Sequence, residues 1–142
     1  MKLVSLVLLG SIAATPALAV TAIAPQAIRI IDGDSIMLNN TTRVRAVGYD
    51  TPEVRGKCAK EKELAALATK RLTELLKGPG KVATMKWSKG KDAYGRGLAR
   101  LYSNHQNVGP ILISEGLARP LAESAIRRGA THDWCKFAPS GN

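Results

Sequence analysis

The chain of 142 residues has 21 lysines and arginines against 11 aspartates and glutamates, a formal net charge of +10 at pH 7. This length suits one domain with a single core and excludes a second domain of ordinary size. The basic residues recur along the whole chain rather than in one tail. They therefore favour a polyanionic partner, nucleic acid first and an anionic surface second.

The first residues predict an export signal. Lys2 is followed by the apolar run LVSLVLLGSIAA and then by Ala17, Leu18 and Ala19, a pattern typical of a cleavage site. A membrane anchor is the alternative, but the run is too short to cross about 30 Å of hydrocarbon. We expect residues 1–19 to be a signal peptide. Residues 20–142 would then form one exported domain, periplasmic or secreted, with no membrane contact after the signal is removed.

Three strands in a meander are predicted next. Alternating apolar residues mark strands at 28–31 and 35–38, and a third strand covers 43–48. The tripeptide DGD at 32–34 separates the first strand from the second, and NN at 39–40 predicts a hairpin turn.

A long amphipathic helix is predicted over residues 58–77, because the apolar period changes there from two to nearly four. Its apolar face contains Leu64, Leu67, Ala68, Leu72, Leu75 and Leu76. The sequence GPG at 78–80 ends the helix.

The remaining elements are two strands, at 81–87 and 98–102, a second short helix at 108–115, and a weak helix at 123–128. The chain beyond Cys135 is expected to fray. Five short strands with one helix between the third and fourth predict an α+β fold that is mainly β. We expect a five-stranded OB-fold barrel with the amphipathic helix between strands 3 and 4 and a short second helix after strand 5.

The two cysteines, Cys58 and Cys135, lie far apart in the sequence. Because export favours oxidation, we predict a disulfide between them. Two separate thiols are the alternative. Metal binding is disfavoured because neither cysteine has a second cysteine or a histidine at ligand spacing.

The motif DTPE allows two interpretations. Asp50 or Thr51 as N-cap, Pro52 at the first helical position and Glu53 in the first turn would form an ordinary helix start. Considered alone, this interpretation is favoured over catalysis. The motifs DGD and YGRG, considered alone, are also typical of turns.

In combination these motifs are more specific. DGDS, then R-x4-D-T-P-E, then D-A-Y-G-R-G-L-A, interleaved with strand, strand, helix and strand, resemble the thermonuclease family of staphylococcal-nuclease-like nucleases. The resemblance covers about residues 28–120, including the sequence GLARP after the second helix.

The resemblance implies a metal site. Asp34 and Asp50 match carboxylate ligands of a single Ca²⁺, and the main-chain carbonyl of Thr51 matches a third ligand. Calcium is a hard cation that prefers oxygen ligands, so these groups suit it. Asp32 matches an acid near the metal that acts through water or only shapes the turn.

The resemblance also implies catalytic and substrate-binding residues. Glu53 matches the general base that takes a proton from the attacking water, or orients that water. Arg45 and Arg96 match two arginines that bind the phosphate, for which paired guanidinium donors are suited. A solvated strand residue is the alternative for Arg45. Tyr94 matches a tyrosine that hydrogen-bonds a terminal phosphate.

The sequence departs from the family pattern at several positions. Ala93 stands where the family has a lysine, and the stacking aromatic residues expected after GLA are replaced by the sequence RPLAE at 119–123. Weaker nucleotide binding and an altered base preference follow, since stacking contributes about 1 to 3 kcal/mol per base. Histidines and tryptophans are expected to have structural rather than catalytic roles, at positions His105, His132, Trp87 and Trp134.

The function predicted from the resemblance is an exported, Ca²⁺-dependent phosphodiesterase that hydrolyses DNA and RNA with low sequence specificity and leaves 3′-phosphate ends. Single-stranded or unpaired nucleic acid is the expected substrate, and a monomer is the default state. The alternative is a catalytically inactive nucleic-acid-binding module of the same fold. A surface protein that binds anionic polymers through bulk charge is a third possibility.

Overall fold

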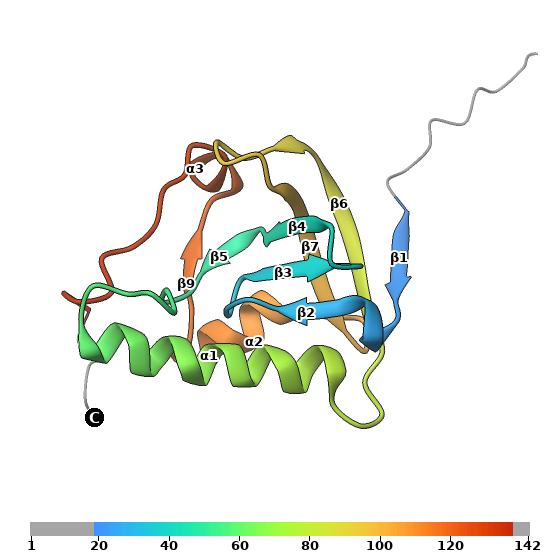
Figure 1. Cartoon of the computed structure of the whole chain (residues 1–142), viewed down its shortest axis with the longest axis horizontal. Helices are drawn as coiled ribbons and strands as arrows, with labels where there is room; N and C mark the ends of the chain where they lie inside the picture. The colour runs from blue at the N-terminus through green and yellow to red at the C-terminus, as the bar shows by residue number, and fades with distance from the viewer. Residues whose placement is uncertain (1–18, 138–142) are drawn as a thin grey trace, which may run out of the picture.

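The computed structural model describes residues 19–137. Within them, a strongly curved sheet lies against a long helix (Figure 1). The strands are β1 (Val20–Ile23), β2 (Ile28–Ile30), β3 (Ser35–Leu38), β4 (Thr42–Ala46), β5 (Gly48–Asp50), β6 (Ala83–Lys91), β7 (Gly97–Ser103), β8 (Gln106–Asn107) and β9 (Arg119–Leu121). The helices are α1 (Ala59–Lys77), α2 (Val108–Ser114) and α3 (Glu123–Arg127), with a 3-10 turn at Pro25–Ala27.

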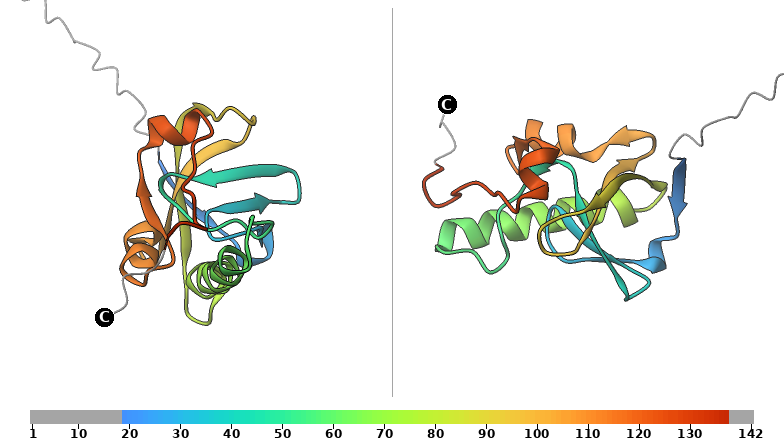
Figure 2. Two further views of the ribbon diagram at one scale, coloured as in Figure 1. Left: turned by 90° about the vertical axis from the view of Figure 1, so that its left-hand side faces the viewer. Right: turned by 90° about the horizontal axis from the view of Figure 1, so that it is seen from above.

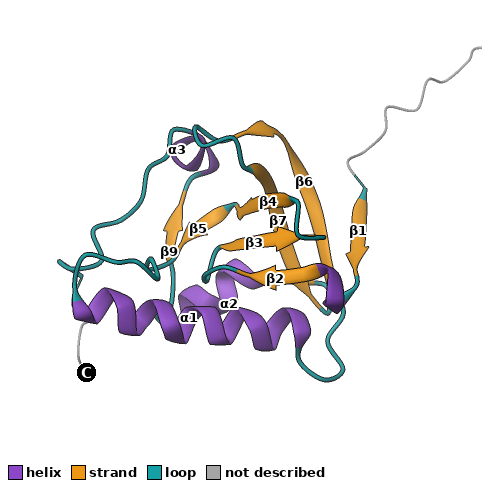
Figure 3. Ribbon diagram, in the orientation of Figure 1, coloured by secondary structure: helices purple, strands orange, loops and turns teal. Residues whose placement is uncertain are grey.

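The predicted fold class is confirmed. The main sheet has the strand order β1-β6-β7-β4-β3-β2, in which β4 and β7 run parallel and the other pairs along this order are antiparallel. The five predicted strands correspond to β2, β3, β4, β6 and β7, so their order is the one expected of an OB-like sheet. The sheet curls into a half-barrel over α1 (Figure 3).

The hairpin between β3 and β4 forms as its sequence predicts. Asn39 and Asn40 both have positive φ, 49° and 57°, which asparagine tolerates better than most residues. The N–H of Thr41 donates to the carbonyl of Leu38 and closes the turn at 3.0 Å. The turn sets the register that pairs Arg45 with Ser35 across the two strands.

Helix α1 begins at Ala59 and packs its small and leucine side chains against the concave face of the sheet. It ends where the N–H of Gly78 donates to the carbonyl of Glu74. The interpretation of DTPE as a helix start is wrong, because residues 51–58 form a loop before the helix. Asp50 and Thr51 bind other partners, described below, so neither caps α1.

Several elements differ from the sequence prediction. The third predicted strand is divided at Val47: β4 stays in the main sheet, while β5 turns away and pairs with β9. Gly48 has a φ of +94°, which permits this change of direction. Strand β6 continues to Lys91, past the predicted end, with a register shift after Trp87. Strand β1 adds to the free side of β6.

The C-terminal segment packs beside the start of α1. After α3 the chain runs down to the N-terminal end of α1 (Figures 1 and 2), where a disulfide joins Cys58 and Cys135 with their Cα atoms 6.0 Å apart. The predicted pairing is therefore confirmed. The predicted signal peptide lies outside the described residues except for Ala19. Within residues 19–137, none of the helices combines the length and apolarity that crossing a membrane requires.

Candidate active site

The predicted site residues come from separate elements that meet at one end of the sheet. Asp32 and Asp34 lie in the turn between β2 and β3, Arg45 lies on β4, and Asp50 ends β5. The loop after β5 carries Thr51 and Glu53, and the loop between β6 and β7 carries Tyr94 and Arg96. A pocket of about 290 Å³ is lined by Arg43, Arg45, Asp50, Glu53, Tyr94, Arg96 and residues 129–131. The pocket thus brings together residues up to 88 positions apart, from Arg43 to Thr131.

Asp34 lies beneath this pocket, with only 2% of its surface exposed. Its Oδ1 accepts the hydroxyl of Ser35 at 2.9 Å, and its Oδ2 accepts the backbone N–H of Thr51, also at 2.9 Å. The turn and the loop after β5 are therefore tied together through one carboxylate. Gly33 makes this approach possible, since a Cβ there would lie 2.8 Å from both Ala68 and Thr51.

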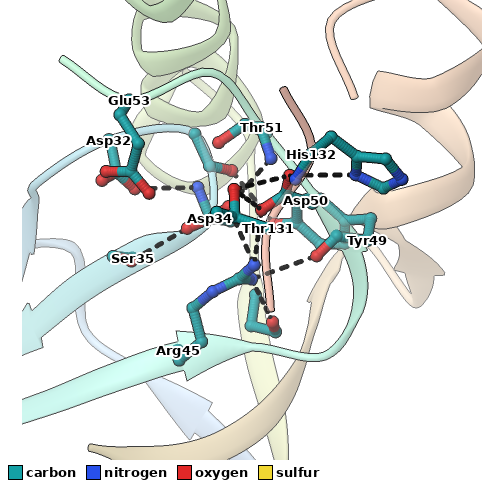
Figure 4. Close-up of polar contacts among 12 residues, drawn as sticks. Asp32, Asp34, Ser35, Arg45, Tyr49, Asp50, Thr51, Glu53, Thr131 and His132 are labelled. Atoms are coloured by element: carbon teal, nitrogen blue, oxygen red, sulfur yellow. Dashed lines mark hydrogen bonds and ion pairs between the residues drawn. The ribbon is translucent and has the colours of Figure 1, made fainter. Parts of the chain in front are cut away.

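Arg45 is buried rather than solvated, with 4% of its surface exposed. Its Nη2 lies 3.1 Å from Oδ2 of Asp34 and 3.1 Å from Oδ1 of Asp50, so one guanidinium bridges the two aspartates. Its Nη1 donates to the carbonyls of Ala46 and Tyr49 at 2.6 and 3.0 Å. The sequence alternative of a solvated strand residue is wrong, and the strand positions this arginine among the acids (Figure 4).

Asp50 receives most of its hydrogen bonds from the C-terminal segment. Its Oδ2 accepts the backbone N–H of His132 at 2.9 Å and the indole N–H of Trp134 at 3.1 Å. The hydroxyl of Thr131 lies 3.1 Å from the same oxygen, and Nδ1 of His132 lies at 3.0 Å. These contacts were not predicted: His132 and Trp134 were expected to have structural roles only, and Thr131 was not considered.

Asp32 and Glu53 are drawn close together in Figure 4, and both line a second pocket with Ser35, Arg43 and Arg96. Burial of Asp32, followed by the negative charges of Asp34 and Glu53, raises its pKa to about 8. Partial desolvation, followed by the charges of Asp34 and Asp50, raises the pKa of Glu53, against the opposing effect of Arg45 and Arg96. Both carboxyl groups therefore resist ionisation in the protein without a bound cation.

Arg96 and Tyr94 are held by a buried acid of the same loop. Asp92 accepts the backbone N–H groups of Tyr94 and Arg96 at 2.9 Å each, and Nε of Arg96 lies 2.7 Å from its Oδ2. Arg96 keeps 19% of its side chain exposed and also reaches Ser35 at 3.4 Å. Tyr94 is 71% exposed, with its ring 5.4 Å from the guanidinium carbon of Arg96.

A family model described as staphylococcal nuclease homologue matches residues 43–134, which is more than half of the chain. The chain belongs to this family. The match includes Thr131, His132 and Trp134, which contact Asp50, and it begins after the turn that carries Asp32 and Asp34.

A curated relative is also similar to this staphylococcal nuclease homologue. The SPbeta prophage-derived endonuclease YokF of Bacillus subtilis (strain 168) is 36% identical over 96 residues. The aligned part is 64% of this chain and 32% of the relative. The chain therefore spans about a third of the length of that relative.

The donor set of this staphylococcal nuclease homologue fits a hard divalent cation. Carboxylate oxygens are the ligands that Ca²⁺ prefers. A cation would favour the ionised forms of Asp32 and Glu53, whose pKa values are raised first by burial and then by the neighbouring acids. The hydroxyl of Thr51 is buried and lacks a hydrogen-bond partner among residues 19–137. Asp50 offers mainly Oδ1, because its Oδ2 already accepts several donors.

A second group of potential ligands does not suit calcium. Cys58, Glu61 and Cys135 lie close together, but the two sulfurs form the disulfide and sulfur is a poor ligand for Ca²⁺. Glu61 instead accepts the backbone N–H groups of Lys57 at 2.8 Å and Glu53 at 3.4 Å, so its carboxylate holds the loop that carries Glu53.

The sequence did not predict the supporting roles of Asp92, Glu61 and residues 131–134. Asp92 is part of the DAYGRG motif, and its spacing to Tyr94 is typical of a turn in which an aspartate accepts the N–H of the residue two positions later. Glu61 stands in the first turn of α1, where an acid is ordinary. Residues 131–134 give no periodic or motif signal.

Proposed function

We propose that this staphylococcal nuclease homologue is a Ca²⁺-dependent phosphodiesterase that hydrolyses DNA and RNA with low sequence specificity and leaves 3′-phosphate ends. The observation that carries the proposal is the convergence of Arg45, Asp50, Glu53 and Arg96 on one pocket, with Asp34 directly beneath it. A binding module would not require a carboxylate base, metal-type acids and two arginines in one place.

Asp34, Oδ1 of Asp50 and the carbonyl of Thr51 would hold the ion. A bound Ca²⁺ would neutralise phosphate charge and lower the pKa of nearby water. Glu53 takes a proton from the attacking water, and its raised pKa makes it a stronger base than an ordinary glutamate. Water attacks phosphorus, the bond from phosphorus to the 5′-oxygen breaks, and that oxygen leaves as a hydroxyl after taking a proton from solvent.

The two arginines have different surroundings and therefore different contributions. Arg96 is partly exposed and would donate to the phosphate oxygens as negative charge grows on them. Arg45 is already bound to Asp34 and Asp50, so it also keeps these two acids together. Tyr94, whose side chain lines the pocket, would donate to a terminal phosphate.

Basic side chains continue beyond the pocket. Arg43 also borders a pocket that contains Lys91, and the exposed Lys86 and Lys89 follow on the same strand, β6. Such a surface suits the phosphate backbone of a flexible single strand and reads no sequence. The absence of the family's stacking aromatics fits this low specificity.

We also propose export to an oxidising compartment, the periplasm or the exterior, and a monomeric state. The disulfide between Cys58 and Cys135 supports export, since structural disulfides persist where thiols are not kept reduced.

The test is digestion of end-labelled single-stranded DNA and RNA in Ca²⁺ or in EGTA. Arg96→Ala is expected to lower the rate by about 100- to 1000-fold, and Glu53→Gln by about 100-fold or more. Arg29→Ala and Glu63→Gln change exposed residues that do not line the pocket and serve as matched controls. Mass spectrometry of the products distinguishes 3′-phosphate from 3′-hydroxyl ends.

Full cleavage in EGTA would refute calcium dependence, and unchanged rates in both variants would refute the assignment of these residues. Tight binding of single-stranded DNA without any cleavage would identify the inactive binding module instead.

A further inference from the structure

The carboxylate of Asp50 has two differently occupied oxygens. Oδ1 lies on the side of Arg45, at 3.1 Å from Nη2, and that nitrogen also contacts Asp34. Oδ2 lies on the side of the C-terminal segment, where the N–H of His132 and the indole N–H of Trp134 donate to it at 2.9 and 3.1 Å. Thr131 reaches both oxygens, at 3.3 and 3.1 Å.

The donors on the Oδ2 side are Thr131, His132 and Trp134, three of the four consecutive residues 131–134, which we call the strap. Trp134 is 1% exposed, although it lies only three residues before the end of the described chain. Its ring packs edge-on against His132 and Phe137, with ring centroids 6.2 and 5.4 Å apart. The strap is therefore built into the site.

Both ends of the strap are fixed. Before it, the N–H of Ala130 donates to the carbonyl of Ala125 in α3 at 3.0 Å. After it, Cys135 is bonded to Cys58, which stands directly before α1 at the end of the loop that carries Thr51 and Glu53. A small pocket of about 110 Å³ lies between this loop and the strap and is bordered by both.

We propose that the strap is a positioning segment for Asp50 and that the disulfide Cys58–Cys135 keeps it in place, so that the oxidised protein binds Ca²⁺ more tightly than the reduced one. This role rests on the proposed calcium site. By occupying Oδ2, the strap fixes the orientation of the carboxylate, with Oδ1 on the side of Arg45, whose Nη2 also contacts Asp34. Loss of a group that orients a metal ligand typically weakens metal binding by about 10- to 100-fold.

Two other roles of the strap make different predictions. If the strap only closes the hydrophobic core, its variants lose stability but keep the calcium affinity of the wild type. If the strap competes with the ion for Asp50, its removal increases calcium affinity. Only a decrease in affinity supports positioning.

The test is calorimetric titration of the oxidised full-length protein with Ca²⁺, without nucleic acid, so that catalysis is not the readout. Thr131→Val and Trp134→Phe each remove one donor and keep most of the side-chain volume. We expect each to weaken binding by about 10-fold or more. Thr131→Ser keeps the hydroxyl and should bind Ca²⁺ with the affinity of the wild type. Trp87→Phe removes the other indole of the chain and serves as the matched control for Trp134→Phe.

The indole N–H of Trp134 gives a second readout. The chain has two tryptophans, so a ¹⁵N-labelled sample gives two indole signals, which Trp87→Phe assigns. Calcium should shift the Trp134 signal, because its acceptor is the Asp50 carboxylate, and should leave that of Trp87 nearly unchanged. Reduction with dithiothreitol should also move the Trp134 signal and weaken calcium binding, with near-ultraviolet circular dichroism checking that the domain remains folded.

The variant Asp34→Asn distinguishes a wrong positioning role of the strap from a wrong assignment of the calcium site. If the wild type does not bind Ca²⁺, both the proposed site and the strap's role are refuted. If the wild type binds and Asp34→Asn does not, while Thr131→Val and Trp134→Phe bind like the wild type, only the positioning role is refuted. Because both strap variants keep the disulfide, they test the role even if the reduced protein unfolds.

Discussion

The raised pKa of Asp32 makes a quantitative prediction for the protein without metal. Its carboxyl has a pKa of about 8 in the fold, mainly through burial and then through Asp34 and Glu53, against 3.8 ordinarily. Between these two values the folded state keeps a proton that the unfolded state releases. The free energy of unfolding must therefore decrease as the pH rises from about 4 to about 8.

The size of the effect follows from the two pKa values. At 1.36 kcal/mol per pKa unit, the difference corresponds to on the order of 5 kcal/mol, reached when Asp32 is fully ionised. This is a large part of the stability of a domain of this size. In the wild type, the N–H of Asp34 donates to Oδ1 of Asp32 at 3.1 Å. Replacement of Asp32 by asparagine keeps an oxygen that can accept this hydrogen bond and removes the titratable charge.

The assay is urea unfolding in EGTA at pH values from 5 to 9, for the wild type, Asp32→Asn and the exposed control Glu63→Gln. From the same two pKa values, Asp32→Asn should be more stable than the wild type by about 2 kcal/mol at pH 5 and by roughly 5 to 6 kcal/mol at pH 8.5. In Ca²⁺ this advantage should shrink, because the proposed cation would offset the repulsion. A constant difference between Asp32→Asn and the wild type at every pH would refute the reasoning.

Two further predictions concern stability. The disulfide closes a loop with a sequence separation of 77. The double variant Cys58→Ser, Cys135→Ser should therefore lose about 4 kcal/mol of its free energy of unfolding in urea. A loss below about 1 kcal/mol would contradict a loop-closure effect of this size. Gly33→Ala should lose about 1 to 3 kcal/mol, because its Cβ would overlap Ala68 and Thr51. Thermal unfolding measures that loss, and an unchanged midpoint would show that the turn can move away from α1.

The parts of the fold that sequence predicts are those with a local signal. The helix over 59–77 and the strands before it have clear periods, and Asn39 with Asn40 identifies the hairpin. Strands β5 and β9 pair over three residues each, and they are about 70 residues apart. No pattern within either segment indicates such a partner, so this small sheet was missed.

In the candidate site, too, the features with a local sequence signal were predicted and the contacts between distant segments were not. The acids and arginines stand in motifs that together resemble those of the thermonuclease family, and this resemblance implied their roles. The structure brings them together. Their surroundings could not be predicted in the same way. Arg45 was expected to face either solvent or a phosphate, yet it bridges Asp34 and Asp50. The donors from His132 and Trp134 lie 82 and 84 positions after Asp50 in the sequence. They stand in a short polar segment whose sequence has no periodicity, so no pattern indicates this contact.

The arrangement of charge gives a reason why a strongly basic protein would keep its acids in the middle of the site. Asp34 and Asp50 bind one buried guanidinium, and Asp32 and Glu53 lie near these two acids, while three other arginines, Arg43, Arg55 and Arg96, line the pockets around them. The outer arginines attract a phosphate backbone, but the inner carboxylates repel it at short range. In the proposed function, a divalent cation bound to the inner carboxylates makes the electrostatic potential positive at the position where the phosphate reacts. Substrate could then gather on the basic surface without metal, whereas a phosphate could enter the reactive position only when the ion is bound.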